Sequence, residues 1–207
     1  MSTGATSGRL TPKGRATRDR IVAAAAGLMF EGGVAGTSTE DVLKAARVAS
    51  PSQLYHYFGD KRALVQAVIE HQTESVLGFQ RPLLSRLDSF EALEAWRDAI
   101  VGAQLARGHH SGCPIGSLSA ELSDRDPRAR TELAAAYGKW EEAIRRGLEA
   151  MRDRGELTED ADPGYLALAL LTALQGGLLM NQARQDTVAL ETVLTAMIER
   201  VRRHAAT

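Results

Sequence analysis

Apolar residues recur every three or four positions along most of the chain, which is the spacing that places side chains on one face of an α-helix. Alternating runs of Val, Ile and Thr are nearly absent, and no Asn-Gly or Asp-Gly pair marks a hairpin turn. Glycine, proline and aspartate divide the pattern into about nine segments, and no unit of about 20 to 50 residues repeats. The pattern therefore predicts an all-α fold of about nine helices, the first three short, and disfavours a helical solenoid.

The first two predicted helices are bounded by glycine and by serine. The first helix is expected from about Thr17 to Glu31, where a glycine pair ends it. The second is expected to follow Ser38, whose hydroxyl can cap the free amides while Asp41 completes a capping box three residues later. The inward faces should hold Ile21, Ala24, Ala25, Leu28 and Met29 on the first helix, and Val42 and Ala46 on the second.

A third short helix follows a sharper boundary. Ser50 is the expected N-cap, Pro51 the first helical residue, where a missing N–H costs nothing, and Gln53 the second half of another capping box. The helix should run only from Pro51 to Tyr57. Two short helices joined by a three-residue turn have the size of a helix-turn-helix, with Val48 and Leu54 filling the angle between them.

The outer face of this third helix carries Ser50, Ser52, Gln53, Tyr55 and His56, which are short or planar hydrogen-bonding side chains. Such side chains reach phosphate oxygens and base edges when a helix N-terminus lies in the major groove of DNA. The alternative interpretation is a solvated helix face with two aromatic residues packed beneath it. The helix alone does not decide between these two interpretations.

The distribution of charge favours the DNA interpretation. The whole chain has a formal charge of −1, from 25 Lys and Arg against 26 Asp and Glu, which by itself does not indicate nucleic acid. Residues 1–62, however, carry nine cations and five acids, and the remaining 145 residues carry a net charge of −5. The first third of the chain therefore has a net charge of +4. A domain that binds DNA by neutralising its phosphates requires such an excess of cations.

Four consecutive segments within the first 64 residues also follow a known pattern. They run from Arg20 to Gly33, from Thr37 to Val42, from Ala45 to Ser50, and from Leu54 to Leu64. Together they resemble the DNA-binding domain of TetR-family transcriptional regulators, and the last segment, L-Y-H-Y-F-x-x-K-x-x-L, is highly specific for that family. Two residues depart from the pattern: Met29 stands where Phe is usual, and Arg47 stands where a turn Gly is usual and is expected to adopt its conformation.

The resemblance implies a homodimeric repressor that binds a palindromic operator in double-stranded DNA. Within the DNA-binding domain, Gln53 is the expected base-reading residue, since its amide can pair bidentately with adenine. The expected phosphate and groove contacts come from Thr37, Ser38 and Thr39 at the start of the second helix, from Ser50, Pro51, Ser52, Gln53, Tyr55 and His56 on the third, from Lys61 at the start of the fourth, and from Arg15 and Arg18 with the basic arm.

A second candidate site lies in the remaining two thirds of the chain. A stripe from Tyr137 to Met151 shares one helix face, although such a stripe is more often plain core than the lining of a cavity. Residues 112–122 and 174–179 resemble the regulatory domain of the TetR-family branch that includes the lincomycin-resistance repressor LmrA, which implies a small apolar or aromatic effector. The expected ligand-binding residues are Trp96, Cys113, Ile115, Leu118, Tyr137, Trp140, Ile144, Met151 and Gln175.

The last two predicted helices are candidates for a dimer interface. Tyr165 to Met180 is apolar almost all round, but about 16 residues are fewer than the roughly 20 that a bilayer requires, so we expect a buried helix and no membrane partner. With the final helix it is expected to form a four-helix bundle across a two-fold axis; the alternative is that both helices close a monomer's core. The expected interface contains Leu171, Leu174, Gly176, Gly177, Leu178, Leu190, Val193, Leu194, Met197 and Val201.

These interpretations divide the chain into a disordered basic arm (1–16), a helix-turn-helix domain (17–62) and a ligand-binding and dimerisation domain (63–207). A single cysteine and the lack of an apolar leader fit a cytoplasmic protein. No catalytic residue, metal ligand or cofactor is predicted. Three alternatives stay open: an enzyme with Cys113 as nucleophile and His109 or His110 as base, a metal- or thiol-responsive regulator sensing through these three residues, and an interaction module that does not bind DNA.

Overall fold

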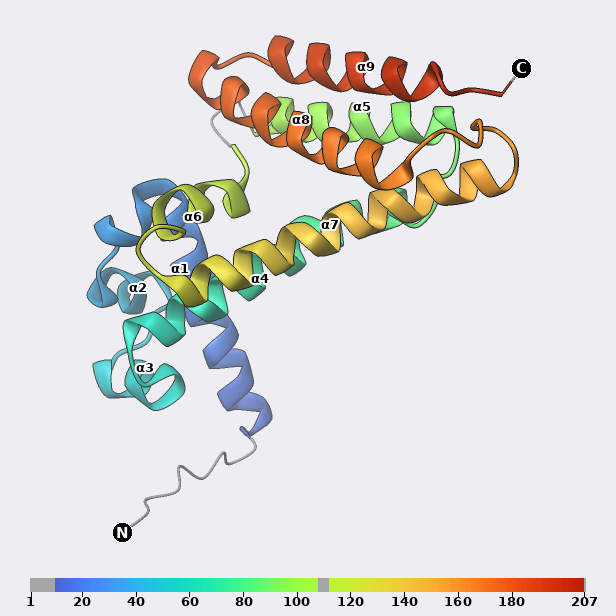
Figure 1. The fold of residues 1–207 in the computed structure, drawn as a ribbon. Coiled ribbons are helices and arrows are strands. Elements are labelled where there is room, and N and C mark those ends of the chain that lie inside the picture. The colour runs from blue at the N-terminus through green and yellow to red at the C-terminus, as the bar shows by residue number, and fades with distance from the viewer. Residues whose placement is uncertain (1–9, 108–111, 207) are drawn as a thin grey trace. The chain divides into compact units, whose positions relative to one another are not determined.

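The computed structural model describes residues 10–107 and 112–206, and these fold into nine helices without a strand (Figure 1). The predicted all-α fold is confirmed. The chain forms two compact units, the first ending at His71 and the second beginning at Gln72. The helices are α1 (Pro12–Gly36), α2 (Thr39–Ala45), α3 (Pro51–Phe58), α4 (Lys61–Leu84), α5 (Phe90–Ala106), α6 (Pro114–Leu122), α7 (Pro127–Asp153), α8 (Pro163–Arg184) and α9 (Val188–Arg202).

Helix α1 is longer at both ends than the sequence pattern predicts. It begins at Pro12 because the Thr11 hydroxyl accepts a hydrogen bond from the Gly14 N–H at 3.1 Å and caps the first turn. Residues 12–16 are therefore helical and not part of a disordered arm, while residues 1–9 lie outside the described part of the chain. At the other end the helix continues to Gly36 across a kink at Gly33, whose φ of 75° suits glycine.

Helices α1, α2 and α3 share one small core. Val42 and Leu54 have no exposed surface, and Ala46 and Val48 are buried beside them, as predicted. The buried face of α1 is rotated from the predicted one, because nearly every residue from 21 to 26 is apolar and the period alone could not select the inner face. The buried positions on α1 are Ile21, Val22, Ala25, Ala26, Met29 and Val34, whereas Ala24 and Leu28 are only half-buried.

The turn between α2 and α3 depends on Arg47. Its φ of 53° lies in the left-handed region, as the missing glycine led us to expect. The conformation lets the Val48 N–H reach the Leu43 carbonyl at 2.9 Å and closes the end of α2. A non-glycine residue in this conformation costs about 1 kcal/mol, and the buried Val48 and Leu54 side chains hold the turn against that cost.

The predicted capping box at the start of α2 is present. The Ser38 hydroxyl accepts from the Asp41 N–H at 3.1 Å, and the Asp41 carboxylate accepts from the Ser38 N–H at 3.2 Å. The Ser38 hydroxyl also donates to the Asp41 carboxylate at 2.5 Å, and this bond, together with the one from the Ser38 N–H, lowers the pKa of Asp41 below its ordinary value of 3.8. The stabilisation from the ionised carboxylate is therefore fully present above that ordinary value, and it is lost as the pH falls through the lowered pKa.

Replacing Ser38 by alanine should lower the free energy of unfolding by about 1 kcal/mol, because the Asp41 N–H loses its acceptor. Urea unfolding at neutral pH measures this difference. Ser52→Ala is the matched control, since Ser52 is exposed and does not cap a helix. Equal stabilities for the two variants would contradict the capping role of Ser38.

In the second unit, α8 lies between α7 and α9, and α9 also packs along α5 (Figure 1). The core of this unit contains both tryptophans, and neither has more than 1% of its surface exposed. Glycine allows two close approaches: a Cβ on Gly147 of α7 would lie 2.1 Å from the Leu87 carbonyl oxygen, and one on Gly177 of α8 would lie 2.9 Å from a Leu190 methyl group. The backbone of α7 therefore lies close to the connection between α4 and α5, and the backbone of α8 lies close to α9.

Helix α8 is longer than the apolar stretch that predicted it. Its 22 residues include an 18-residue window with a mean hydropathy of 1.4, which is enough, by length and composition alone, to cross a membrane. The core helix of a soluble protein passes the same test, and in the second unit Leu170 and Leu174 have no exposed surface because they pack against neighbouring helices. The prediction that this segment is too short for a bilayer is thus corrected, whereas its burial is observed.

Candidate functional sites

The polar face of α3 is exposed, as the sequence pattern requires of a DNA-reading helix. Ser52, Gln53, Tyr55 and His56 are all exposed, and 52% of Tyr55 is accessible. Leu54 and Phe58 point the other way and are buried in the core of the first unit. Pro51 occupies the first turn and is exposed too, so the start of α3 presents hydrogen-bonding side chains on one surface.

The cap of α3 differs from the predicted one. Ser50 is the N-cap residue, but its side chain makes no capping hydrogen bond, and its oxygen lies 2.6 Å from the Ser52 oxygen instead. Gln53 therefore does not complete a capping box. The physical reason is Pro51, which presets the first turn and removes one free N–H, so less is gained from a side-chain cap. The exposed Gln53 amide is consequently not tied up at the helix end.

The three residues expected to contact phosphates at the start of α2 differ from one another in exposure. Ser38 is exposed and Thr39 is half-buried. Thr37 is only 4% exposed, and its hydroxyl donates to the Gly33 carbonyl at 2.8 Å. The Thr37 side chain thus corrects our expectation: it closes the end of α1 inside the first unit and does not face a phosphate.

Lys61 also has a role that sequence reasoning missed. Its ammonium donates to the carbonyls of Val34 and Thr37, at 2.9 and 2.7 Å. Lys61 thereby ties the start of α4 to the segment that joins α1 and α2. Because an ammonium has three N–H donors, one donor is left for the phosphate contact that the resemblance implies.

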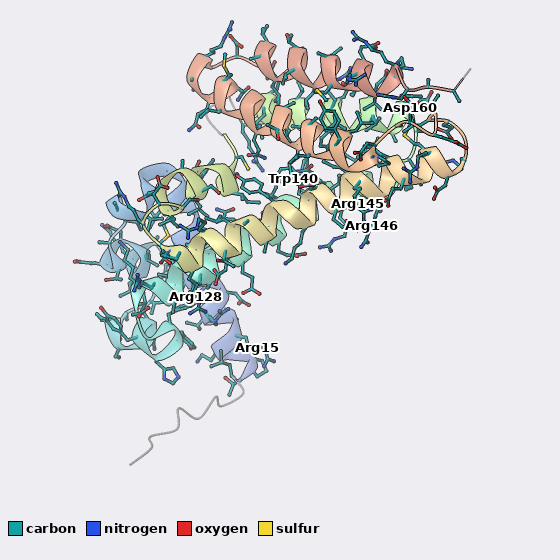
Figure 2. The ribbon with its side chains drawn as sticks, in the orientation of Figure 1. Arg15, Arg128, Trp140, Arg145, Arg146 and Asp160 are labelled. Carbon is teal, nitrogen blue, oxygen red and sulfur yellow. The ribbon has the colours of Figure 1, made fainter. Side chains whose placement is uncertain are left out.

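The expected arginine contacts lie on α1. Arg15 donates to the Leu10 carbonyl at 2.6 Å and is exposed (Figure 2), and the Arg18 guanidinium lies over the Phe58 ring at 5.2 Å. Two further cations, Arg20 and Arg47, are exposed and line a groove floored by alanines 23, 24, 45 and 46. The sequence analysis counted both in the charge but did not assign them to the site.

Part of the expected ligand-binding set comes together in the second unit. A Cβ on Gly116 of α6 would lie 3.2 Å from the Gln175 amide oxygen, 3.3 Å from the Cys113 Cβ and 3.8 Å from the Tyr137 hydroxyl. Trp140 lies one turn after Tyr137 on α7 and is buried (Figure 2). Residues of α6, α7 and α8 therefore meet here; we call Cys113, Ser119, Tyr137, Trp140 and Gln175 the donor cluster.

The rest of the expected ligand-binding set is packed core. Ile115, Ile144 and Met151 have no exposed surface, and Leu118 is 5% exposed. Trp96 is fully buried, and its indole N–H donates to Gln80 at 2.9 Å. The Trp96 N–H therefore already has an acceptor and is not a free donor for a ligand.

Most of the residues expected at a dimer interface are buried within the protomer. Leu174, Leu190, Leu194 and Val201 have no exposed surface, since they pack α8 and α9 together. Leu171 and Leu178 are 4% exposed and Gly177 is also buried, so these seven residues contribute to the core of the protomer. Gly176 is exposed, and Val193 and Met197 are half-buried.

The face of α8 that points away from α7 and α9 carries an apolar stripe that sequence reasoning missed. Four large apolar side chains spaced along the helix are exposed, with Leu179 at 67%. Because α8 is apolar on every side, no periodicity distinguished this stripe from the inner face. The stripe consists of Tyr165, Leu168, Thr172, Gly176, Leu179 and Met180, and Val188 at the start of α9 is exposed as well.

The alternative site at His109, His110 and Cys113 can be assessed only at Cys113, since both histidines lie outside the described residues. Burial raises the pKa of the Cys113 thiol. A protonated, buried thiol is a poor nucleophile and a poor metal ligand. Within residues 10–107 and 112–206, no group of three His, Cys, Asp or Glu residues is placed to hold a metal ion.

Comparison with known families gives matches to both units. Residues 21–68 match the model described as bacterial regulatory proteins, tetR family. Residues 87–197 match the model described as tetracyclin repressor-like, C-terminal domain. The two matches together span more than half of the chain, so they bear on the whole molecule and not only on its DNA-binding part.

Individual relatives agree with these matches. An HTH-type transcriptional regulator of Lactococcus lactis is 29% identical over 183 residues, which cover 86% of this chain and 89% of the relative. The transcriptional regulator AcuR of Cereibacter sphaeroides is 27% identical, covering 73% of this chain and 69% of AcuR. A crystal structure of a TetR transcriptional regulator from Chloroflexus aurantiacus superposes with a TM-score of 0.78 at 26% identity, covering 94% of this chain and 98% of that one.

Proposed function

Because this chain belongs to the TetR family of DNA-binding transcriptional regulators, we propose that it is a homodimeric repressor that leaves a palindromic operator when a small effector binds. The observation that carries this proposal is the exposed hydrogen-bonding face of α3, set beside exposed cations of α1 and of the turn before α3. Two copies of such a helix, one turn of DNA apart, would contact successive major grooves of about 34 Å spacing. Such a protein acts in the cytoplasm.

Base reading is assigned to Gln53 and phosphate binding to the surrounding cations. Gln53 is exposed near the start of α3, where a recognition helix meets base edges. Arg20 on α1, Lys44 on α2 and Arg47 in the turn before α3 are exposed in the same unit, and they supply charge without sequence information. Lys61 is less suitable for a test, because its removal also breaks two hydrogen bonds within the first unit.

Replacing Gln53 by alanine should relax sequence selectivity. An operator is first selected from random duplexes by the wild-type protein, and its affinity is compared with that of a scrambled duplex. We expect the ratio of the two affinities to fall about tenfold in the variant, since a bidentate contact contributes about 1–3 kcal/mol of discrimination. The matched control is Lys44→Ala, which should weaken both duplexes alike and lower the salt slope by about one. Fluorescence anisotropy at several salt concentrations measures both. A wild-type protein without sequence selectivity would contradict the proposed function.

The dimer is assigned to the exposed stripe of α8 together with Val188. An isologous interface uses the same patch of both copies, and a helix face running from Tyr165 to Met180 is long enough to pair with its own copy. At Gly176, in the middle of the stripe, an added Cβ would have no atom of a neighbouring element within 4 Å, so a partner helix can approach there.

The effector is assigned to the donor cluster, which belongs to α6, α7 and α8 of the second unit. The segments 112–122 and 174–179 contribute Cys113, Ser119 and Gln175, and their resemblance to the branch that includes LmrA supports placing the chain in that branch. Effector binding would act through α4, which is one continuous helix from Lys61 at the DNA-binding unit to Leu84 in the second unit. A shift of α4 would change the separation of the two recognition helices.

A further inference from the structure

The donor cluster contains buried donors that no described residue satisfies. The indole Nε1 of Trp140, the amide Nε2 of Gln175 and the hydroxyl oxygen of Ser119 are each buried, and the Trp140 N–H has no hydrogen-bond partner among the described residues. Ser119 interacts with the Tyr137 hydroxyl and Gln175 with the Cys113 thiol, but the Gln175 amide has two N–H groups, so one of them is left. Trp140 itself is 1% exposed. A buried polar group left without a partner costs about 1–3 kcal/mol, so the unsatisfied N–H groups of Trp140 and Gln175 are expected to serve a purpose.

These donors come from three helices that meet at Gly116. Ser119 lies one turn after Gly116 on α6, Trp140 lies one turn after Tyr137 on α7, and Gln175 lies on α8. The Gly116 Cβ position is 3.2 Å from the Gln175 side chain and 3.8 Å from the Tyr137 hydroxyl. The absence of a side chain at Gly116 thus lets α6 approach Gln175 of α8 and Tyr137 of α7 closely.

The cluster is neutral. Burial raises the pKa of both Tyr137 and Cys113, so the phenol and the thiol keep their protons at neutral pH. None of the five residues is a lysine or an arginine. An anion placed here would lose its hydration without gaining a counter-ion, which is strongly unfavourable. A neutral acceptor loses far less hydration and would satisfy the donors.

We propose that the effector is a neutral molecule that presents a carbonyl oxygen, as in a ketone, ester or amide, to the Trp140 and Gln175 donors. This inference rests on the proposed function and specifies its effector class. The carbonyl accepts from the indole N–H of Trp140 and from an amide N–H of Gln175. Ser119, Tyr137 and Gln175 are half-buried, although the donor atoms of Ser119 and Gln175 are themselves buried.

The two tryptophans make this proposal measurable. In protein labelled with isotopic tryptophan, the indole N–H of Trp140 should move downfield when a carbonyl oxygen binds, while that of Trp96, already bonded to Gln80, should not. The probes are 2-acetylnaphthalene, methyl 2-naphthoate and N-methyl-2-naphthamide, with 2-ethylnaphthalene and the 2-naphthoate anion as matched controls. We expect at least one carbonyl probe to bind about tenfold more tightly than either control, and Trp140→Phe to remove that difference.

Gln175→Met provides a second variant that keeps the side-chain volume, and it should weaken the carbonyl probe without changing the affinity for 2-ethylnaphthalene. The inference is wrong if no carbonyl probe moves the Trp140 signal at millimolar concentration, or if the hydrocarbon or the anion binds as tightly. Operator binding by the ligand-free protein is measured in parallel. Loss of sequence selectivity there contradicts the proposed function, whereas selective binding with an unmoved Trp140 signal contradicts this inference alone.

Discussion

Replacing Gly147 by alanine is expected to destabilise the second unit by about 3 kcal/mol, at the upper end of what overpacking a core costs. The added methyl carbon would lie 2.1 Å from the Leu87 carbonyl oxygen, 2.8 Å from its carbonyl carbon and 3.1 Å from its Cβ. The first two are backbone atoms, so relief requires a shift of α7 or of the connection between α4 and α5, and a change of rotamer cannot provide it. Leu87 has no exposed surface, so its backbone has little freedom to move.

The same helix offers a matched control. Gly138 also lies within α7, but its Cβ position has no atom within 4 Å. Gly138→Ala should therefore stabilise the protein by about 1 kcal/mol through helix propensity alone. Urea unfolding followed by circular dichroism compares the two variants directly. If Gly147→Ala were as stable as Gly138→Ala, the close contact between α7 and the Leu87 carbonyl would be absent in solution.

The elements that the sequence predicted well are encoded locally. The capping box of Ser38 and Asp41, the proline at the start of α3 and the left-handed turn at Arg47 all depend on residues within a few positions of one another. Their hydrogen bonds and dihedral preferences are the same in any fold. For that reason the helix-turn-helix and the exposed face of α3 could be placed before the structure was known.

The features that the sequence could not place depend on packing between distant segments. Thr37 and Lys61 look like surface contacts in the sequence, yet Lys61 reaches back 24 residues to the Thr37 carbonyl. Gly176 and Gly177 are chemically identical neighbours, but only Gly177 contacts α9. No property of the sequence distinguishes them, because α8 is apolar on all sides and the choice of inner face is made by α7 and α9.

The same limitation applies to the second site. The stripe on α7 predicted Tyr137 and Trp140 correctly as members of one helix face, but it could not say which buried polar atoms lack partners. Trp96 and Trp140 illustrate this: both are buried, and only the structure shows that Gln80 satisfies the first, whereas no described residue satisfies the second. A hydrogen-bond deficit is a property of the packed molecule and leaves no trace in the hydrophobic pattern.

The largest loss of DNA binding is expected from Leu179→Glu. Leu179 is 67% exposed on the apolar stripe of α8, so the change removes no core contact within the protomer. In an isologous interface, however, the substitution places two carboxylates in the same buried patch, and each loses hydration without a counter-ion. The dimer should dissociate into folded monomers, and each monomer could then contact only one half of a palindromic operator.

We expect operator affinity to fall at least about 100-fold, because the second half-site no longer contributes to binding. Analytical ultracentrifugation measures the dissociation, fluorescence anisotropy measures the affinity, and circular dichroism should show unchanged helix content. Leu105→Glu is the control, since Leu105 is 51% exposed at the end of α5 and lies outside the stripe. A Leu179→Glu protein that remains dimeric and binds the operator would place the interface on another surface, and Leu105→Glu dissociating instead would point to α5.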